Sequence, residues 1–284
     1  MMKIKDILKS QLSEEELEFV PRSFEIIGSR EKAVAIVEIP RELEGKKVLI
    51  ANAIMKLNKN VKSVLRKASG RKGELRLRDF ELIAGDENTE VIHKEHGCLF
   101  KLDPRKVYFS AREAGERQRI AKQVKAGENI LVMFSGIMPY GIVIAKVQPK
   151  VKKVIGIELN QVAHEYAKEN VRINKVSHLV IPMLGDVREK WKELKEKFDR
   201  IVMPLPFESE NFLDIAFKCL KEGGIIHFYS LGEEKKLFEN AIRIIEEKAR
   251  EQRKKIKILE KKKLFPYKPR AHKICIDFSV FEEI

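Results

Sequence analysis

Hydrophobic positions follow two periods along this chain of 284 residues. From about residue 108, short apolar runs of strand length alternate with stretches in which apolar residues recur every three or four positions, as on one face of a helix. The predicted strands cover 130–134, 153–158, 178–184, 200–203 and 225–230; the predicted helices cover 112–125, 140–146, 161–174, a stretch ending at 197, and 209–221. This alternation indicates a mostly parallel sheet with helices on both faces.

The two ends of the chain have different patterns. Near the C-terminus, 257–265 and 272–281 have no helix between them and predict an antiparallel hairpin at the sheet edge. The first 105 residues contain a predicted helix at 14–19, a strand at 32–39 and an amphipathic helix at 46–58. We therefore predict an α/β protein with a small N-terminal α+β domain (1–105) followed by a doubly wound sheet domain (106–284).

The charge balance indicates a polyanionic partner. Lys and Arg number 57 against 43 Asp and Glu, a formal net charge of +14. The segments 56–78, with nine basic residues, and 248–273, with twelve, are the most basic stretches. Such segments are expected to contact nucleic acid phosphates, although lysines on an edge strand also prevent unwanted strand pairing. We favour RNA over an acidic membrane surface.

Cysteine usage and hydropathy point to the cytoplasm. No run approaches the roughly 20 apolar residues of a membrane helix, and the three cysteines form no C-x-x-C pair, which is typical of a reducing compartment. The cluster His93-Lys-Glu-His-Gly-Cys98 lacks the spacing and the fourth ligand of a usual zinc site, so we predict no metal.

Two carboxylates follow successive predicted strands. In an open α/β sheet, ligands bind beyond the carboxyl ends of the strands, here just after Phe134, at Glu158, at Asp186 and at 204–206. Glu158 could accept both ribose hydroxyls of a nucleoside, and Asp186 could accept from an adenine amino group. Each acid could instead cap the next helix, but two in order favour a nucleoside-cofactor site.

Four blocks carry a family resemblance: Gly73-Glu-Leu-Arg-Leu-Arg78, the run from Lys106 to Arg119, Gly185-Asp-Val-Arg188, and Gly223-Gly-Ile-Ile-His-Phe-Tyr229. Together they resemble the archaeal and eukaryotic type of tRNA (guanine-37) N1-methyltransferase over about 73–278. The resemblance implies a Rossmann-like methyltransferase domain, S-adenosylmethionine as cofactor, and methylation of the base 3′ to the anticodon. The implied partner is the anticodon arm of tRNA, bound by a monomer.

The resemblance also implies residue roles. Arg78 and Arg112 match arginines that stabilise the target guanine, and Glu116 matches the general base. The cofactor-binding positions implied by the resemblance and by the strand ends are Tyr108, Phe134, Gly136, Glu158, Asp186 and Pro206. By spacing alone, Glu116 fits equally well an acid in the first helical turn that pairs with Arg119 or Arg112.

The chain departs from the family pattern at three positions. Val132 replaces an Asp, Met138 replaces the second Gly of the first loop, and Pro204 replaces an Asn. The printed sequence starts at the family's second domain, without a counterpart of the domain that binds the tRNA elbow. Two alternatives therefore stay open: a wybutosine-pathway enzyme that transfers an aminocarboxypropyl or methyl group to a modified base at position 37, and a catalytically silent tRNA-binding homologue.

Overall fold

The computed structural model describes residues 3–73 and 77–282. Its contacts separate two compact units, Met1–Ala111 and Arg112–Ile284, so the division falls shortly after the predicted boundary at 105. Residues 74–76, which belong to the basic segment and to the first resemblance block, lie outside the described residues.

The first unit is an α+β module on a four-stranded sheet, in which β2 and β3 are parallel and the outer pairs are antiparallel. In order across the sheet, its strands are β1 (Glu25–Gly28), β2 (Ala33–Val37), β3 (Val61–Lys72) and β4 (Leu77–Gly85). A separate hairpin joins β5 (Val91–Glu95) to β6 (Cys98–Leu102). The helices are α1 (Ile4–Leu8), α2 (Glu14–Phe19), η1 (Arg41–Lys46) and α3 (Lys47–Leu57).

Apolar spacing explains this first core. All five residues of β2 are buried, and α3 buries Ile50 and Ile54, one helical turn apart, in the same hydrophobic cluster. The predicted helix at 14–19 is confirmed with both ends, and the strand and helix predicted at 32–39 and 46–58 are confirmed in slightly shorter form.

The second unit contains a seven-stranded sheet in the order β12-β13-β11-β10-β7-β8-β9. The strands are β7 (Asn129–Met133), β8 (Lys153–Glu158), β9 (Val180–Leu184), β10 (Phe198–Met203), β11 (Leu220–Glu233), β12 (Lys254–Lys268) and β13 (Ala271–Glu282). The five strands from β9 to β11 are parallel, and β13 joins β11 antiparallel, with β12 as the outer strand of the hairpin. The predicted doubly wound sheet and its antiparallel edge hairpin are confirmed.

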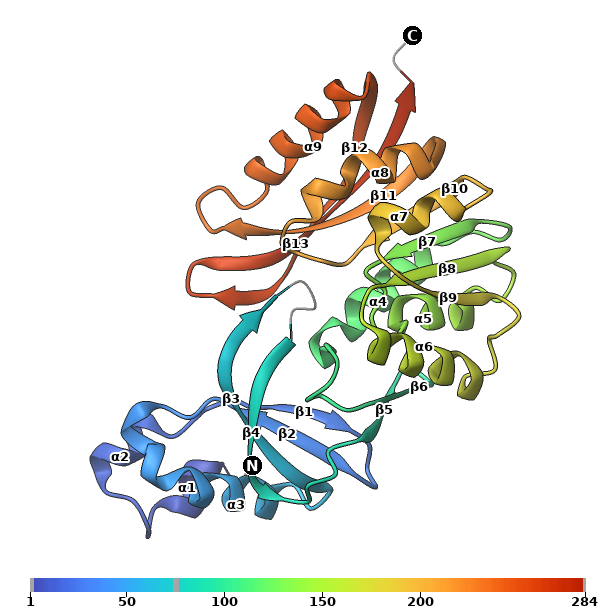
Figure 1. Ribbon diagram of the computed structural model, residues 1–284. Coiled ribbons are helices and arrows are strands. Elements are labelled where there is room, and N and C mark those ends of the chain that lie inside the picture. The colour runs from blue at the N-terminus through green and yellow to red at the C-terminus, as the bar shows by residue number, and fades with distance from the viewer. Residues whose placement is uncertain (1–2, 74–76, 283–284) are drawn as a thin grey trace. The chain divides into compact units, whose positions relative to one another are not determined.

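Helices cover both faces of this sheet, with α5 and α6 on one side and α8 and α9 on the other (Figure 1). The second unit's helices are η2 (Ala111–Glu113), which begins at the unit boundary, α4 (Ala114–Gln123), α5 (Pro139–Val147), α6 (Gln161–Ile173), α7 (Val187–Lys190), η3 (Trp191–Glu193), η4 (Ser209–Phe212), α8 (Leu213–Cys219) and α9 (Glu239–Glu251). Among the described residues, no helix is both long and apolar enough to cross a membrane.

Several predicted boundaries were wrong. The helix expected to reach 197 ends at Glu193, and the helix expected to reach 221 ends at Cys219. The strand expected at 225–230 runs from Leu220 to Glu233, because it pairs with β10 on one side and along β13 on the other. Long-range pairing therefore extended a strand that its local apolar run defines only in part.

Candidate functional site

The strand order places a topological switch point between β7 and β10. The chain proceeds from β7 outward through β8 to β9, then returns to the other side of β7 as β10. Two loops leave the carboxyl ends of these neighbouring strands, Phe134–Met138 after β7 and Pro204–Phe207 after β10. Ligands of open α/β sheets bind at such a point.

The loop after β7 has an unusual backbone. Phe134, Gly136 and Met138 alternate through the left-handed region with φ of 56°, 55° and 69°. The Phe134 ring packs edge-on against Phe212, with 4.8 Å between centroids. The Gly136 amide donates to an oxygen of Glu158 at 2.7 Å, which ties this loop to the end of β8.

Glu158 lies at the end of β8, as predicted. Its other carboxylate oxygen accepts from the Asn160 amide at 2.8 Å, and burial raises the pKa of the carboxyl above its ordinary value. Each carboxylate oxygen has a second acceptor site, so both ribose hydroxyls can still be bound. Glu158 therefore serves the loop structure in addition to its predicted cofactor role.

Met138, which replaces a glycine of the family pattern, packs its side chain into the interior of the protein. Its side chain is fully buried, and its thioether and methyl group fill the volume that side chains at Gly141 and Gly156 would occupy. A Cβ at Gly156 would lie 2.2 Å from Met138 Sδ. The absence of side chains at Gly141 and Gly156 thus makes room for the Met138 side chain, which stands where the family pattern has a glycine.

Asp186 ends the turn after β9 and combines two roles. Its side chain caps α7 by accepting from the Arg188 amide at 2.8 Å, and it also pairs with the Arg188 guanidinium. That hydrogen-bonded ion pair lowers the pKa of Asp186. Helix capping, the alternative interpretation of this acid, is realised, while the adenine contact stays a prediction.

The surroundings of the two acids suit a nucleoside. Leu159 and Leu184 are large apolar side chains that are 39% and 38% exposed, and Leu184 pairs in register with Glu158. Apolar surface beside carboxylates matches an adenosine moiety, which has apolar ring faces and polar edges. These residues fit the adenosine part of S-adenosylmethionine, the cofactor that the family resemblance implies.

Glu116 is buried in α4 and both its oxygens are engaged. Arg119 donates to the two oxygens from Nε and Nη2, each at 2.8 Å, and the Tyr229 hydroxyl donates at 2.6 Å. The Tyr140 hydroxyl, at the start of α5, lies 3.2 Å from that of Tyr229. The ion pair with Arg119 predicted as an alternative role is present. Of the three hydrogen bonds, Oε1 accepts two and Oε2 accepts one, so Oε2 keeps a second acceptor site for a proton donor.

A buried polar network continues from Arg119. Asp277 accepts from Arg119 at 2.6 Å and from His227 Nδ1 at 2.7 Å, while His227 Nε2 lies 2.7 Å from Arg200. Since arginine can only donate, His227 is neutral with its proton on Nδ1. Burial lowers the pKa of His227; burial also acts to raise the pKa of Asp277, but His227 and Arg119 overcome it and hold that pKa far below its ordinary value.

His227, Cys275 and Asp277 place possible ligand atoms within 4.8 Å of one another. A metal ion there would face the guanidinium groups of Arg119 and Arg200 and would have to displace their hydrogen bonds. We therefore assign this cluster to the hydrogen-bond network.

A second buried acid precedes Glu116 by one turn. The Glu113 carboxylate accepts from Lys273 Nζ at 2.7 Å, and the same ammonium donates to the Pro204 carbonyl at 3.1 Å. These contacts, with the tyrosine pair, bring the start of α4 to the loops at the switch point. The predicted catalytic helix and the predicted ligand loops thus meet in one place.

The remaining predicted residues of the second unit lie near the hairpin end. The Arg112 guanidinium stacks over the Phe265 ring of β12 at 4.6 Å from its centroid. In the loop after β10, Pro206 precedes Phe207, whose ring packs against Tyr267 at 5.2 Å. Two aromatic residues of β12 therefore support segments from which the base and cofactor contacts were predicted.

Arg78 and Tyr108 belong to the first unit. They line one cavity of about 50 Å³, with Glu25, Lys67, Phe80 and Phe109 among the other lining residues. Their predicted roles stay predictions.

The basic segment of the first unit is partly neutralised. Arg66 pairs with Glu44 and Glu81, and Lys67 pairs with Glu38 at 3.5 Å. These acids come from outside the segment, which a count along the sequence does not reveal.

Several residues of the network were not predicted as functional. The missed residues are Glu113, Tyr140, Arg200, His227, Tyr229, Lys273 and Asp277. A signal was present for the last two, since Lys273 and Asp277 are charged residues among the apolar residues Ile274, Ile276 and Phe278, and a buried charge needs a partner. His227 and Tyr229 stand in a block that the family resemblance had already marked.

Comparison with known proteins agrees with this geometry. Residues 91–259 match the TRM5/TYW2 methyltransferase domain, and residues 4–89 match the TYW2 N-terminal domain. The tRNA (guanine(37)-N(1))-methyltransferase Trm5b of Pyrococcus abyssi is 42% identical over 92% of this chain and 76% of its own length. Its crystal structure superposes with a TM-score of 0.85 at 41% identity, covering 95% of this chain and 78% of that one.

A second kind of relative is also similar. The tRNA(Phe) (4-demethylwyosine(37)-C(7)) aminocarboxypropyltransferase of Methanocaldococcus jannaschii is 37% identical over 75% of this chain and 83% of its own length. Both relatives are named for reactions at position 37 of tRNA. The matched domains, which cover most of the sequence, and these identities show that the chain belongs to the TRM5/TYW2 methyltransferase family.

Proposed function

We propose that this protein transfers a methyl group from S-adenosylmethionine to N1 of guanosine 37 in tRNA. The observation that carries the proposal is the meeting of Glu113 and Glu116, at the start of α4, with the loops at the β7–β10 switch point. A buried carboxylate there can serve a base bound beside a nucleoside cofactor. The similarity to Trm5b supports the choice of base and of atom.

The chemistry requires what these residues offer. Guanine N1 carries a proton, so methylation needs a base within hydrogen-bond reach and positive charge near O6. S-adenosylmethionine, when bound, supplies an electrophilic methyl group. Glu116 takes the N1 proton as the ring nitrogen becomes methylated, and Arg112, held over Phe265, faces the negative charge that develops on the base; Arg78 is proposed to assist.

The match of residues 4–89 to the TYW2 N-terminal domain favours one second candidate, aminocarboxypropyl transfer to a modified base at the same position. One assay separates the two. The protein is incubated with labelled cofactor and with tRNA carrying guanosine 37 or 4-demethylwyosine, and the modified nucleoside is identified by mass spectrometry. We expect 1-methylguanosine. An aminocarboxypropyl product would support the second candidate, and calorimetric titration showing no cofactor binding would favour a silent tRNA-binding protein.

The proposal extends to the partner and its setting. tRNA is the substrate of relatives of this kind, and we propose that this chain holds the anticodon arm, acts as a monomer and works in the cytoplasm. All three cysteines are buried thiols without a disulfide, which suits a reducing compartment.

A further inference from the structure

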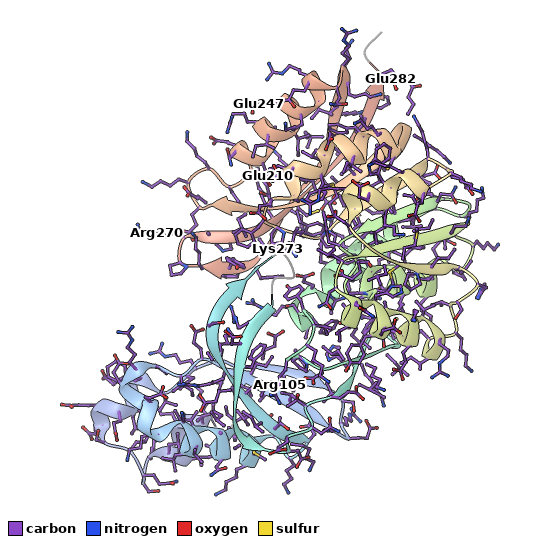
Figure 2. All side chains as sticks on the ribbon, viewed as in Figure 1. Arg105, Glu210, Glu247, Arg270, Lys273 and Glu282 are labelled. Atoms are coloured by element: carbon purple, nitrogen blue, oxygen red, sulfur yellow. The ribbon has the colours of Figure 1, made fainter. Side chains whose placement is uncertain are left out.

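Lys273 is a charged residue at a position that otherwise favours an apolar one. It lies near the start of β13 (Figure 2), within ten consecutive buried residues, and is itself only 2% exposed. Its neighbour Ile274 packs in the hydrophobic core. Burial of an ammonium group is costly unless it is paired and hydrogen-bonded, and a buried ion pair is weak evidence for a purely stabilising role.

The Lys273 ammonium contacts three groups. It donates to the Glu113 carboxylate at 2.7 Å and to the Pro204 carbonyl at 3.1 Å, and it lies 4.9 Å from the centre of the Tyr229 ring. An ammonium has three donors, and these contacts account for two of them and for a cation–π interaction. One side chain therefore joins segments that are distant in sequence.

Each contact belongs to a different part of the proposed active site. Glu113 immediately precedes the helix that carries Glu116, and Tyr229 donates directly to Glu116. Pro204 begins the loop at the carboxyl end of β10, and neither Pro204 nor Pro206 has an amide hydrogen that could anchor that loop. The Pro204 carbonyl is thus an important anchor point, and Lys273 holds it from a strand that is paired on both sides.

We propose that Lys273 is a positioning residue for the transfer reaction: it fixes the loop after β10 relative to the start of α4, so that the target base enters beside Glu116 in a reactive orientation. This inference rests on the proposed function. A rigid strand is a suitable support, since reaction geometry tolerates little displacement. The competing explanation is that Lys273 only neutralises Glu113.

Two variants of the Lys273–Glu113 pair distinguish positioning of the loop after β10 from simple neutralisation of Glu113. Glu113→Gln keeps the Lys273 donor for Pro204, whereas Lys273→Met/Glu113→Gln removes that donor. Both variants also take the Glu113 charge away from the buried Arg117 guanidinium at 4.0 Å, so this effect cancels when the two are compared. Single-turnover transfer, the dissociation constants for S-adenosylmethionine and tRNA, and amide hydrogen exchange at Leu205 and Phe207 are measured for both. The exposed pair Lys236 and Glu239, 3.7 Å apart, provides the matched control double variant.

We expect the double variant to react about tenfold more slowly than Glu113→Gln, with both dissociation constants nearly unchanged and with faster exchange at Leu205 and Phe207. Equal rates and equal exchange in these two variants would overturn the inference. The exchange measurement needs no activity, so an inactive parent protein would refute the proposed function without deciding the loop contact.

If the double variant does not fold, the variant Lys273→Arg distinguishes the positioning role from the neutralising role. Arginine keeps the charge beside Glu113, so a neutralising role predicts the parental rate. Its planar group cannot reproduce the three directions of an ammonium, so a positioning role predicts a rate loss of about threefold or more. A parental rate would overturn the inference.

Discussion

Glu116 shows how one side chain can be structural and reactive at once. We expect Glu116→Gln to lower the single-turnover rate by about 10²- to 10⁴-fold, because a positioned base contributes that much. This corresponds to roughly 3 to 5 kcal/mol of barrier. Affinity for cofactor and tRNA should change little, since glutamine keeps the size and one acceptor oxygen.

Tyr229→Phe is the control for this variant. It removes the 2.6 Å hydrogen bond to Glu116 but leaves the carboxylate and its pairing with Arg119. A large rate loss in Glu116→Gln with a small one in Tyr229→Phe supports proton transfer. A parental rate for Glu116→Gln would end the general-base assignment, and a loss of folding alone would leave the ion pair as its role.

Cofactor affinity should depend on Glu158 and Asp186. Loss of an acceptor for a buried polar group costs roughly 1 to 3 kcal/mol, so alanine at either position should weaken S-adenosylmethionine binding about tenfold or more in calorimetry. Glu158→Ala should also lower the melting temperature, since it frees the Gly136 and Asn160 amides. If both variants bind like the parent, the pocket lies elsewhere.

Asp199 provides a matched control for Glu158. Its carboxylate also accepts from a backbone amide, that of Asn129 at 2.7 Å, but at the opposite end of the sheet. Asp199→Ala should therefore reduce stability without changing cofactor affinity. An equal loss of affinity in this variant would attribute the Glu158 effect to general destabilisation.

At the scale of elements, the loop after β7 depends on the packing of the large Met138 side chain against Gly141 and Gly156, which have no side chains. A Cβ at Gly156 would lie 2.2 Å from Met138 Sδ and 2.8 Å from Ser135 Cβ. We expect Gly156→Ala to cost about 1 to 3 kcal/mol in chemical denaturation, as overpacking does. Gly115→Ala is the control: apart from the backbone of its own helix, no atom lies within 4 Å of the added Cβ, so this variant should not destabilise the protein. An unchanged denaturation midpoint for Gly156→Ala would mean that the Met138 side chain can adopt another position without loss of stability.

The polar network between β11, β13 and α4 should make stability depend on pH. The lowered pKa of His227 means that the unfolded state binds more protons below about pH 6.5, so stability should fall as pH decreases through that value. The lowered pKa of Asp277 adds a further loss below about pH 4. Melting temperatures measured from pH 8 to pH 4 should show the first decline near pH 6.5.

His227→Asn keeps an N–H group for Asp277 and does not titrate. We expect a less stable protein at pH 7 whose melting temperature changes less between pH 6.5 and pH 5 than that of the parent. His178→Asn, which changes an exposed histidine, should keep the parental slope. The same slope in His227→Asn and in the parent would contradict the role of His227.

Local patterns predicted elements better than contacts. Strands such as β7 and β8 were recognisable from their short apolar runs, which are fully buried in β7 and partly buried in β8, and Glu158 was placed correctly because it ends such a run. The early end of the helix near Glu193 was not predictable from propensity, since 194–197 are as helix-compatible in composition as the residues before them. Contacts such as Glu113 with Lys273 span 160 positions and follow only from the sheet order.

At the scale of the whole molecule, the net charge of +14 should make tRNA binding strongly dependent on salt. Lys261, Lys262 and Lys263 are exposed on β12, the outer strand of the edge hairpin. The same hairpin supports Arg112 through Phe265, so phosphates held there would lie on the element that flanks the proposed site. In the first unit, Lys56, Lys59 and Lys62 are exposed and offer a second such surface.

Replacement of Lys261, Lys262 and Lys263 by glutamine should reduce the slope of log affinity against log salt by about two to three, because each phosphate contact contributes about 0.7 to 0.9. The matched control replaces Lys192, Lys195 and Lys197, which are exposed just before β10, at the amino end of the sheet. It makes the same change in net charge far from the switch point, so its slope should stay close to the parental one. Equal slopes in the two triple variants would assign the hairpin lysines to protection of the sheet edge and leave the first unit's lysines to hold the RNA.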